Sequence, residues 1–257
     1  MYTNSWDPNP GAIIRSSDRG NTWQSVDLPF KVGGNMPGRG MGERLAVDPH
    51  NGNIIYFGAR SGNGLWKSTD GGVTWSKVTS FTNVGTYIPD PSDANGYNND
   101  IIGLTFVTFD STSPIINGAT SRIFVGTADN ITASVYVSND AGATWSPVSG
   151  QPGKYFPHKC KLQPAEKALY LTYSDGAGPY DGSAGAVYRY DITNGTWKDI
   201  TPVSGGDLYF GFGGLGVDMQ KPGTLVVASL NSWLPDAQLF RSTDSGNTWS
   251  RIWEWAG

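Results

Sequence analysis

One eight-residue motif recurs along the chain at a nearly constant spacing. Its pattern is Ser-x-Asp-x-Gly-x-Thr-Trp, and the four full copies are SSDRGNTW (16–23), STDGGVTW (68–75), SNDAGATW (138–145) and STDSGNTW (242–249). A degenerate copy, YDITNGTW (190–197), keeps the Thr and the Trp. The five Trp residues that end these copies are 52, 70, 52 and 52 positions apart, so the second interval is longer by 18 residues. A fixed period with one insertion indicates a repeat architecture.

The sequence between the motifs favours short antiparallel strands. In the second unit, residues 44–59 contain two candidate strands around an Asn/Gly turn, and residues 64–69 and 74–79 give a third and a fourth. With 35 Gly, 12% aromatic and only 16% charged residues, the composition points to an all-β protein. Four strands per unit predict a β-propeller with four-stranded antiparallel blades. We expect a half blade and four blades, as follows: 1–26 (half blade), 27–78, 79–148 (with a long loop insertion), 149–200 (with the degenerate motif) and 201–257.

The motif itself is the Asp box, and its chemistry favours a structural role. In a hairpin turn, Asp70 can accept hydrogen bonds from backbone N–H groups a few residues on. Gly72 permits a positive φ angle, and Trp75 can bury its indole between neighbouring blades. Because the box recurs with the period of the fold, we expect it to serve the fold. The carboxylates with this predicted role are Asp18, Asp70, Asp140 and Asp244.

Several function classes are disfavoured by charge and residue counts. The net charge of −4, with no Lys/Arg cluster, argues against a nucleic-acid partner. No run of 18 apolar residues predicts a membrane span. Cys160 is the only cysteine, and the two histidines, His50 and His158, are not in ligand-spaced clusters, so no metal site is expected. The abundance of Trp, Tyr and Asn suits a carbohydrate ligand.

Five motifs outside the boxes, taken in order, resemble glycoside hydrolase family 74. They are NMPGRGMGERLAVDP (35–49), YFGARSGNGLWKSTDGG (56–72), GTADNITASVYVS (126–138), YLTYSDGAGPYDG (170–182) and FGFGGLGVDMQKPGTLVVASLNSW (210–233). The resemblance is close to fungal xyloglucanases and runs over essentially the whole sequence. It implies two seven-bladed propellers packed face to face, with xyloglucan or a related β-glucan bound between them. It also implies inverting endo-hydrolysis of the β-1,4-glucan backbone, without a metal or an organic cofactor.

The sequence departs from the family at the catalytic residues. In the family the general base lies in an RTDIGG-like motif of the first blade, and the general acid lies in the second propeller. KSTDGG (67–72) is superficially similar to the first motif, but Thr74 and Trp75 follow it, which marks an Asp box. No catalytic residue is therefore assigned, and the chain alone is predicted to be inactive. The half blade lacks a clear first strand, so we expect a partial propeller, about four and a half of seven blades, incomplete at both ends.

Four loops hold candidate substrate-binding residues. Trp233 and Asn231 lie in SLNSWLPDAQ, where the Trp could stack on a sugar or pack within the loop. The polar loop 173–182 could offer hydroxyl ligands or be a turn clasped by its Asp side chains, and segment 33–44 could face the cleft or tie down a long loop. The aromatic residues of 207–214 could stack on sugars or be buried. The candidates in these last three loops are Asp175, Tyr180, Asp181, Asn35, Arg39, Glu43 and Phe212.

Two other functions fit the same sequence. The chain could be a self-contained, non-catalytic carbohydrate-binding propeller, or an Asp-box scaffold that binds proteins, as in sortilin-type receptors. The family resemblance favours a secreted parent protein, and the sequons at Asn130 and Asn194 agree with it, although no signal peptide precedes the first unit. The expected partners are the glucan, the missing blades and the second propeller, with no nucleic acid and no membrane.

Overall fold

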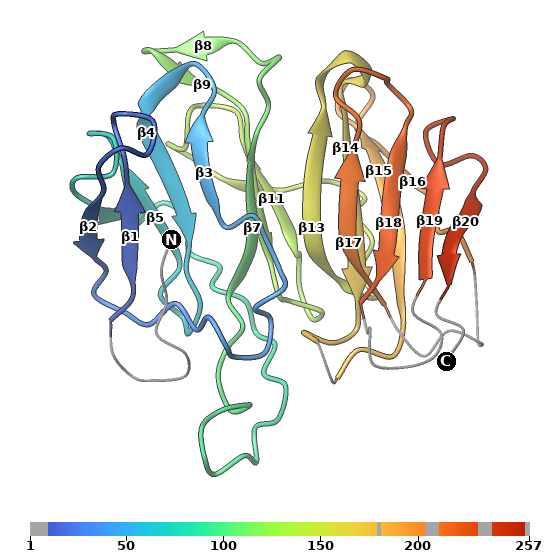
Figure 1. Ribbon diagram of the computed structural model, residues 1–257, viewed down its shortest axis with the longest axis horizontal. Coiled ribbons are helices and arrows are strands. Elements are labelled where there is room, and N and C mark those ends of the chain that lie inside the picture. Colours follow the sequence, from blue (N-terminus) through green and yellow to red (C-terminus); the bar gives the residue numbers. More distant parts are fainter. Residues whose placement is uncertain (1–9, 179–180, 204–210, 231–237, 255–257) are drawn as a thin grey trace.

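The computed structural model describes residues 10–178, 181–203, 211–230 and 238–254, and nearly all of its regular structure is β-strand (Figure 1). Over these residues, four antiparallel four-stranded sheets follow one another along the chain. The first blade consists of β3 (Leu45–Asp48), β4 (Asn51–Gly58), β5 (Leu65–Ser68) and β6 (Ser76–Lys77). The second consists of β7 (Leu104–Phe109), β10 (Ile123–Thr127), β11 (Val135–Ser138) and β12 (Ser146–Pro147). The third consists of β13 (Phe156–Gln163), β14 (Ala168–Ser174), β15 (Gly185–Asp191) and β16 (Thr196–Asp199). The fourth consists of β17 (Phe212–Val217), β18 (Leu225–Ser229), β19 (Gln238–Ser242) and β20 (Ser250–Glu254).

Smaller elements complete the described structure. A half blade pairs β1 (Ala12–Arg15) with β2 (Gln24–Asp27), and a hairpin inside the second blade pairs β8 (Ile115–Ile116) with β9 (Ala119–Thr120). A single 3-10 turn, Pro164–Glu166, lies between β13 and β14. No helix among the described residues has the length and apolar character needed to cross a lipid bilayer.

The blades are arranged as in a propeller. The first strands of successive blades, β3, β7, β13 and β17, are neighbours, so each sheet packs beside the next (Figure 1). The prediction of an all-β propeller with four-stranded antiparallel blades is confirmed, and the described part holds four blades and a half blade.

The core lies between the blades rather than within one of them. Each of four apolar clusters combines side chains from two adjacent sheets, for example Tyr56 of the first blade with Phe109 of the second. The Trp of a box packs against the cluster that its blade shares with the preceding one. Trp145, for instance, lies 5.2 Å from Phe81 between ring centroids. Trp23 belongs to none of these clusters and is 62% exposed.

The box turns lie at the end of the blades where the first and second strands are also joined. In the first blade the Gly71 N–H donates to the Asn53 carbonyl at 3.0 Å, and the second and fourth blades have corresponding bonds. The Asp70 carboxylate accepts from the Thr74 N–H at 2.9 Å and from the Thr74 and Ser68 hydroxyls, and these bonds lower its pKa. The turn is thereby closed around the carboxylate.

Candidate functional site

The candidate residues that are described lie mainly at the end of the blades opposite the box turns. Three segments cover this end: residues 33–44 before the first blade, 80–103 before the second, and 175–178 with 181–184 within the third. We call them together the loop face; it is the lower end of the molecule in Figure 1. The Gly38 N–H donates to the Gly178 carbonyl at 3.2 Å, and the Tyr87 hydroxyl donates to Asp181 Oδ2 at 2.9 Å. Loops from three blades are thus joined directly.

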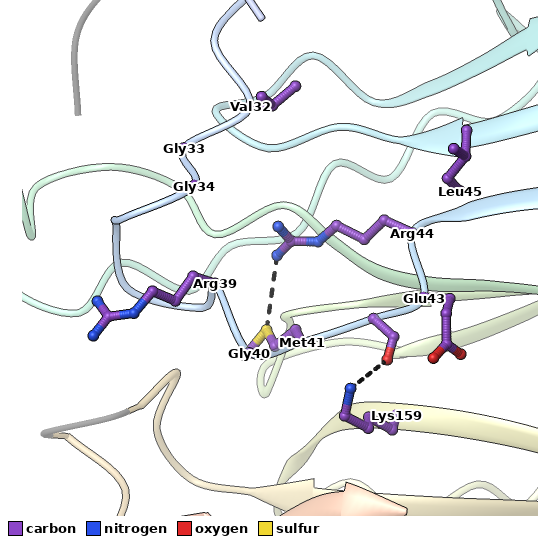
Figure 2. A pocket seen from close by; sticks show the side chains of 11 residues that line it. Val32, Gly33, Gly34, Arg39, Gly40, Met41, Glu43, Arg44, Leu45 and Lys159 are labelled. Atoms are coloured by element: carbon purple, nitrogen blue, oxygen red, sulfur yellow. Dashed lines mark hydrogen bonds between the residues drawn. The ribbon is translucent and has the colours of Figure 1, made fainter. Parts of the chain in front are cut away.

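A cavity of about 450 Å³ opens on the loop face. Figure 2 shows the side chains around it, which come from the 32–45 segment and from β13. Its lining residues are Val32, Gly33, Gly34, Arg39, Gly40, Met41, Gly42, Glu43, Arg44, Leu45 and Lys159. We call it the loop-face cavity. It brings together two residues singled out from the sequence, Arg39 and Glu43.

Arg39 and Asn35 stand at the exposed rim and contact the inserted loop. The Tyr97 hydroxyl donates to the Asn35 carbonyl at 2.6 Å, and Arg39 Nη1 lies 3.4 Å from the same hydroxyl oxygen. Both Arg39 and Asn35 are therefore near an aromatic ring at the surface. This arrangement can bind sugar hydroxyls, but it also holds the insertion against segment 33–44, which is the second interpretation made from the sequence.

Glu43 is an exposed carboxylate that already has a cationic partner. Lys161 Nζ lies 2.6 Å from Glu43 Oε2. Partial burial works to raise the pKa of Glu43, but the hydrogen bond and charge of Lys161, together with Lys159, outweigh it and lower the pKa. Glu43 is thus an anionic acceptor, suited to hydroxyl groups.

Asp175 and Asp181 hold their own loop. Asp175 accepts from the Ser183 N–H, the Ser183 hydroxyl and the Ala184 N–H at 2.6–3.0 Å. Burial works to raise its pKa, but these bonds lower it. Asp181 accepts from the Ala177 N–H at 2.9 Å in addition to the Tyr87 hydroxyl. These contacts have the geometry of a turn clasped by its Asp side chains.

The remaining candidates are placed as follows. Phe212 is 2% exposed and packs beside Phe240 with ring centroids 6.4 Å apart, in the core between the third and fourth blades. Trp233, Asn231 and Tyr180 lie outside the described residues, so their roles stay predictions.

None of the pKa shifts found among the described carboxylates favours a proton donor. Every described Asp or Glu whose pKa departs clearly from its ordinary value has it lowered, by hydrogen bonds or by a neighbouring cation. A general acid for glycoside cleavage needs the opposite shift. Within the described ranges there is also no group of three His, Cys, Asp or Glu residues placed to hold a metal ion.

Sequence reasoning missed Tyr87, Tyr97, Arg44 and Lys159, all of which contribute to the loop face. The two tyrosines lie in the inserted segment 86–100, so the broken repeat period was a usable signal for them. Arg44 and Lys159 had no such signal, because one directly precedes β3 and the other lies within β13, where a single cation is common.

The fold and the box turns together define the class of this protein. It is a β-propeller in which a repeated Asp-containing box closes hairpin turns. No protein-family model matches it. It is 83% identical over 256 residues to a xyloglucanase of Hypocrea jecorina, and 60% identical over 258 residues to a xyloglucanase of a Paenibacillus species. All of the chain is matched in both cases, but only 30% and 25% of the relatives' own lengths.

A solved structure gives the same result. The crystal structure of the GH74 xyloglucanase from Xanthomonas campestris matches 95% of this chain and 34% of its own, with 37% identity and a TM-score of 0.83. The chain therefore belongs to glycoside hydrolase family 74 over the stretch that these proteins share. The stretch spans about 30% of the length of the Hypocrea relative.

Proposed function

We propose that this chain forms one wall of the glucan-binding cleft of a xyloglucan-hydrolysing enzyme. The observation that carries the proposal is the 83% identity, over the whole chain, to a protein named xyloglucanase. The loop face would be the surface that meets the glucan, with Asn35, Arg39 and Glu43 as hydroxyl-binding groups. Trp233, a candidate from the sequence alone, would stack on a sugar ring of the same glucan.

The catalytic pair of that enzyme would lie in the part of the relatives' length that this chain does not span. Inverting hydrolysis requires a protonated carboxylic acid and a carboxylate that activates water, about 6.5–9.5 Å apart. The lowered pKa values of Glu43 and Asp175 favour ionised side chains, and the bonds that hold both Asp175 oxygens leave it poorly placed to act as a base. This supports a chain that binds glucan but does not cleave it. The further blades and a second propeller would be its partners in the complete enzyme, which would act outside the cell on its polymeric substrate.

The proposal is tested by incubating the purified chain with xyloglucan and analysing released oligosaccharides by mass spectrometry, with the boiled chain as control. We expect no release. Release above the control would mean that a working carboxylate pair lies inside these blades and would refute the placement of the catalytic residues.

Binding is measured separately, by calorimetry with a xyloglucan oligosaccharide. We expect saturable binding that is weakened by Trp233→Ala and by Arg39→Ala. Trp23→Ala is the matched control, because Trp23 belongs to a box turn at the opposite end of the blades. Absence of binding to the folded chain, or equal loss in the Trp23 variant, would contradict the assignment of the loop face.

A further inference from the structure

We propose that the loop-face cavity is a carboxylate-binding site, and that its ligand class is a sugar uronate held by the guanidinium of Arg44. The proposal goes beyond the binding of a neutral glucan and does not depend on it. It rests on a partly buried cation whose Nε is enclosed and which has no anionic partner among the described residues, on the charges around it, and on the space beside it.

Arg44 directly precedes β3 and extends its side chain across the cavity, between Gly34 and Met41 (Figure 2). Its Nε is buried and has no hydrogen-bond partner, and its Nη2 contacts only the Met41 sulfur, at 3.9 Å. A thioether is a weak acceptor. Burial, with a contribution from the charge of Arg60, lowers the pKa of Arg44 to about 9, so the guanidinium is charged at neutral pH. Enclosing part of a charged guanidinium without a strong acceptor is costly, and a carboxylate that meets two of its N–H groups would offset that cost.

Two carboxylates of the loop face, Asp100 and Glu43, are engaged elsewhere. Asp100 Oδ2 is shared by Lys31 at 3.1 Å, by Arg60 at 3.3 Å and by the Ser61 hydroxyl at 2.7 Å. Glu43 is paired with Lys161. Among the described residues, no carboxylate lies within ion-pair distance of Arg44. Since no described carboxylate completes this site, the proposal assigns its anion to a ligand.

Two further cations make the cavity electropositive. Lys159 Nζ lies on the β13 side and donates one hydrogen bond, to the Gly42 carbonyl at 3.1 Å. Since an ammonium group has three donors, two remain for a ligand. Arg39 lies at the rim and points away from Arg44 (Figure 2). Together these groups favour an anion over a neutral molecule.

The space and its surroundings suit a sugar better than a bare anion. The volume, about 450 Å³, lies in the range of small-molecule sites. Part of the wall is glycine backbone, and a Cβ placed on Gly40 would meet no atom within 4 Å, so a ring can approach closely there. Glu43 Oε1 is available to accept a ring hydroxyl, because Lys161 contacts Oε2. A uronate combines a carboxylate for Arg44 with hydroxyls for such acceptors.

The first test is an NMR titration of the ¹⁵N-labelled chain with methyl β-glucuronide, with methyl β-glucoside as the neutral control of matched shape. We expect saturable shifts of the amide signals of Gly33, Gly34, Gly40 and Gly42 with the glucuronide. The glucoside should bind at least about tenfold more weakly, because it lacks the charge-assisted hydrogen bonds. Equal binding of the two sugars, or shifts confined to other amides, would overturn the proposal. Equal shifts with sodium sulfate would overturn the assignment of the ligand class.

The second test uses variants of the same chain. Arg44→Gln should weaken glucuronide binding by about tenfold or more, and Arg44→Lys by less, because a lysine keeps the charge but loses the planar pair of donors. Arg241→Gln, which removes an exposed arginine from β19 in the fourth blade, should bind as the original chain does. Undiminished binding by a folded Arg44→Gln chain would refute the role of Arg44. If that variant does not fold, the titration of the unaltered chain tests the proposal: glucuronide must shift the cavity amides and the glucoside must not do so equally. A chain that binds xyloglucan oligosaccharide but not glucuronide would refute this inference alone.

Discussion

A buried carboxylate between the first and second blades gives a quantitative test of how the blades are held together. Asp48 ends β3 and is 2% exposed. Its Oδ2 accepts from the Thr120 N–H at 2.8 Å, and its Oδ1 accepts from the Thr120 hydroxyl and from the His50 N–H at 2.8 Å. Three hydrogen bonds thus end on one buried carboxylate, and two of them cross from one blade to the next.

Asp48→Ala removes all three bonds and leaves the two Thr120 donors buried. Hydrogen bonds to a charged group contribute roughly 1.5–3 kcal/mol each when one partner is deleted, and relaxation around the site returns part of this. We therefore expect the free energy of unfolding to fall by about 3–5 kcal/mol. Asp218→Ala is the matched control, since Asp218 follows the first strand of the fourth blade but its side chain accepts only from the N–H groups of its own turn, Gln220 and Lys221. Its loss should cost about 1 kcal/mol or less.

The assay is urea unfolding at neutral pH, followed by tryptophan fluorescence. The reasoning predicts a large difference between the Asp48 and Asp218 variants. A double-mutant cycle of Asp48→Ala with Thr120→Val should show coupling of about 1 kcal/mol or more, because the two side chains share a bond. If the two Asp variants unfold at the same urea concentration, the cross-blade bonds do not contribute as argued.

Three further predictions concern other positions in the blades. His158 is fully buried, and burial lowers its pKa to about 4, below the ordinary 6.5, so its contribution to stability is present above pH 6.5 and is lost as the pH falls toward 4. The loss of unfolding free energy between pH 6.5 and 4 should approach about 3 kcal/mol and should be absent from His158→Gln. Thermal unfolding of both chains across this pH range measures the difference. If the variant lost as much stability as the original chain, His158 would not be the responsible group. Gly142 has a φ of +87° and a Cβ there would lie 2.2 Å from the Tyr56 hydroxyl oxygen, so Gly142→Ala should cost about 2 kcal/mol or more. Adding Tyr56→Phe should recover only part of that cost, and full recovery in urea titrations would mean that the positive φ angle is not strained. Trp145→Ala should destabilise by about 2–3 kcal/mol and Trp23→Ala by less than about 1 kcal/mol, since only the former packs between blades; equal losses would refute the packing argument.

The repeat was enough to predict the architecture, for a physical reason. Each box combines a turn that Asp70 can close locally with a Trp75 that must find an apolar neighbour. Both requirements are visible in eight residues. The alternation of apolar and polar residues, together with the turn residues between these stretches, predicts the four strands of each blade. These local signals and the repeat period are therefore sufficient to predict the fold.

The site was less accessible to sequence reasoning because its contacts join residues far apart in the chain. The bond between Tyr87 and Asp181 spans 94 positions, and no local pattern contains it. The charges around Arg44 depend on the packing of β13 against the 33–44 segment, which brings Lys159 to the same cavity. Arg39 and Glu43 were predicted from their place in a glycine-rich loop, but Arg44, which lines the same cavity, was not.

The packing of each blade on its neighbours has a consequence for how the chain folds. Most strand contacts join segments close in sequence, so each sheet can form with little loss of loop entropy, and no single blade has to form first. The contacts of the loop face are different, because Gly38 must meet Gly178 across two intervening blades. We therefore expect amide hydrogen exchange during refolding to protect the strands early and the loop face last. The surface that would bind a ligand would then be the slowest part of the molecule to form.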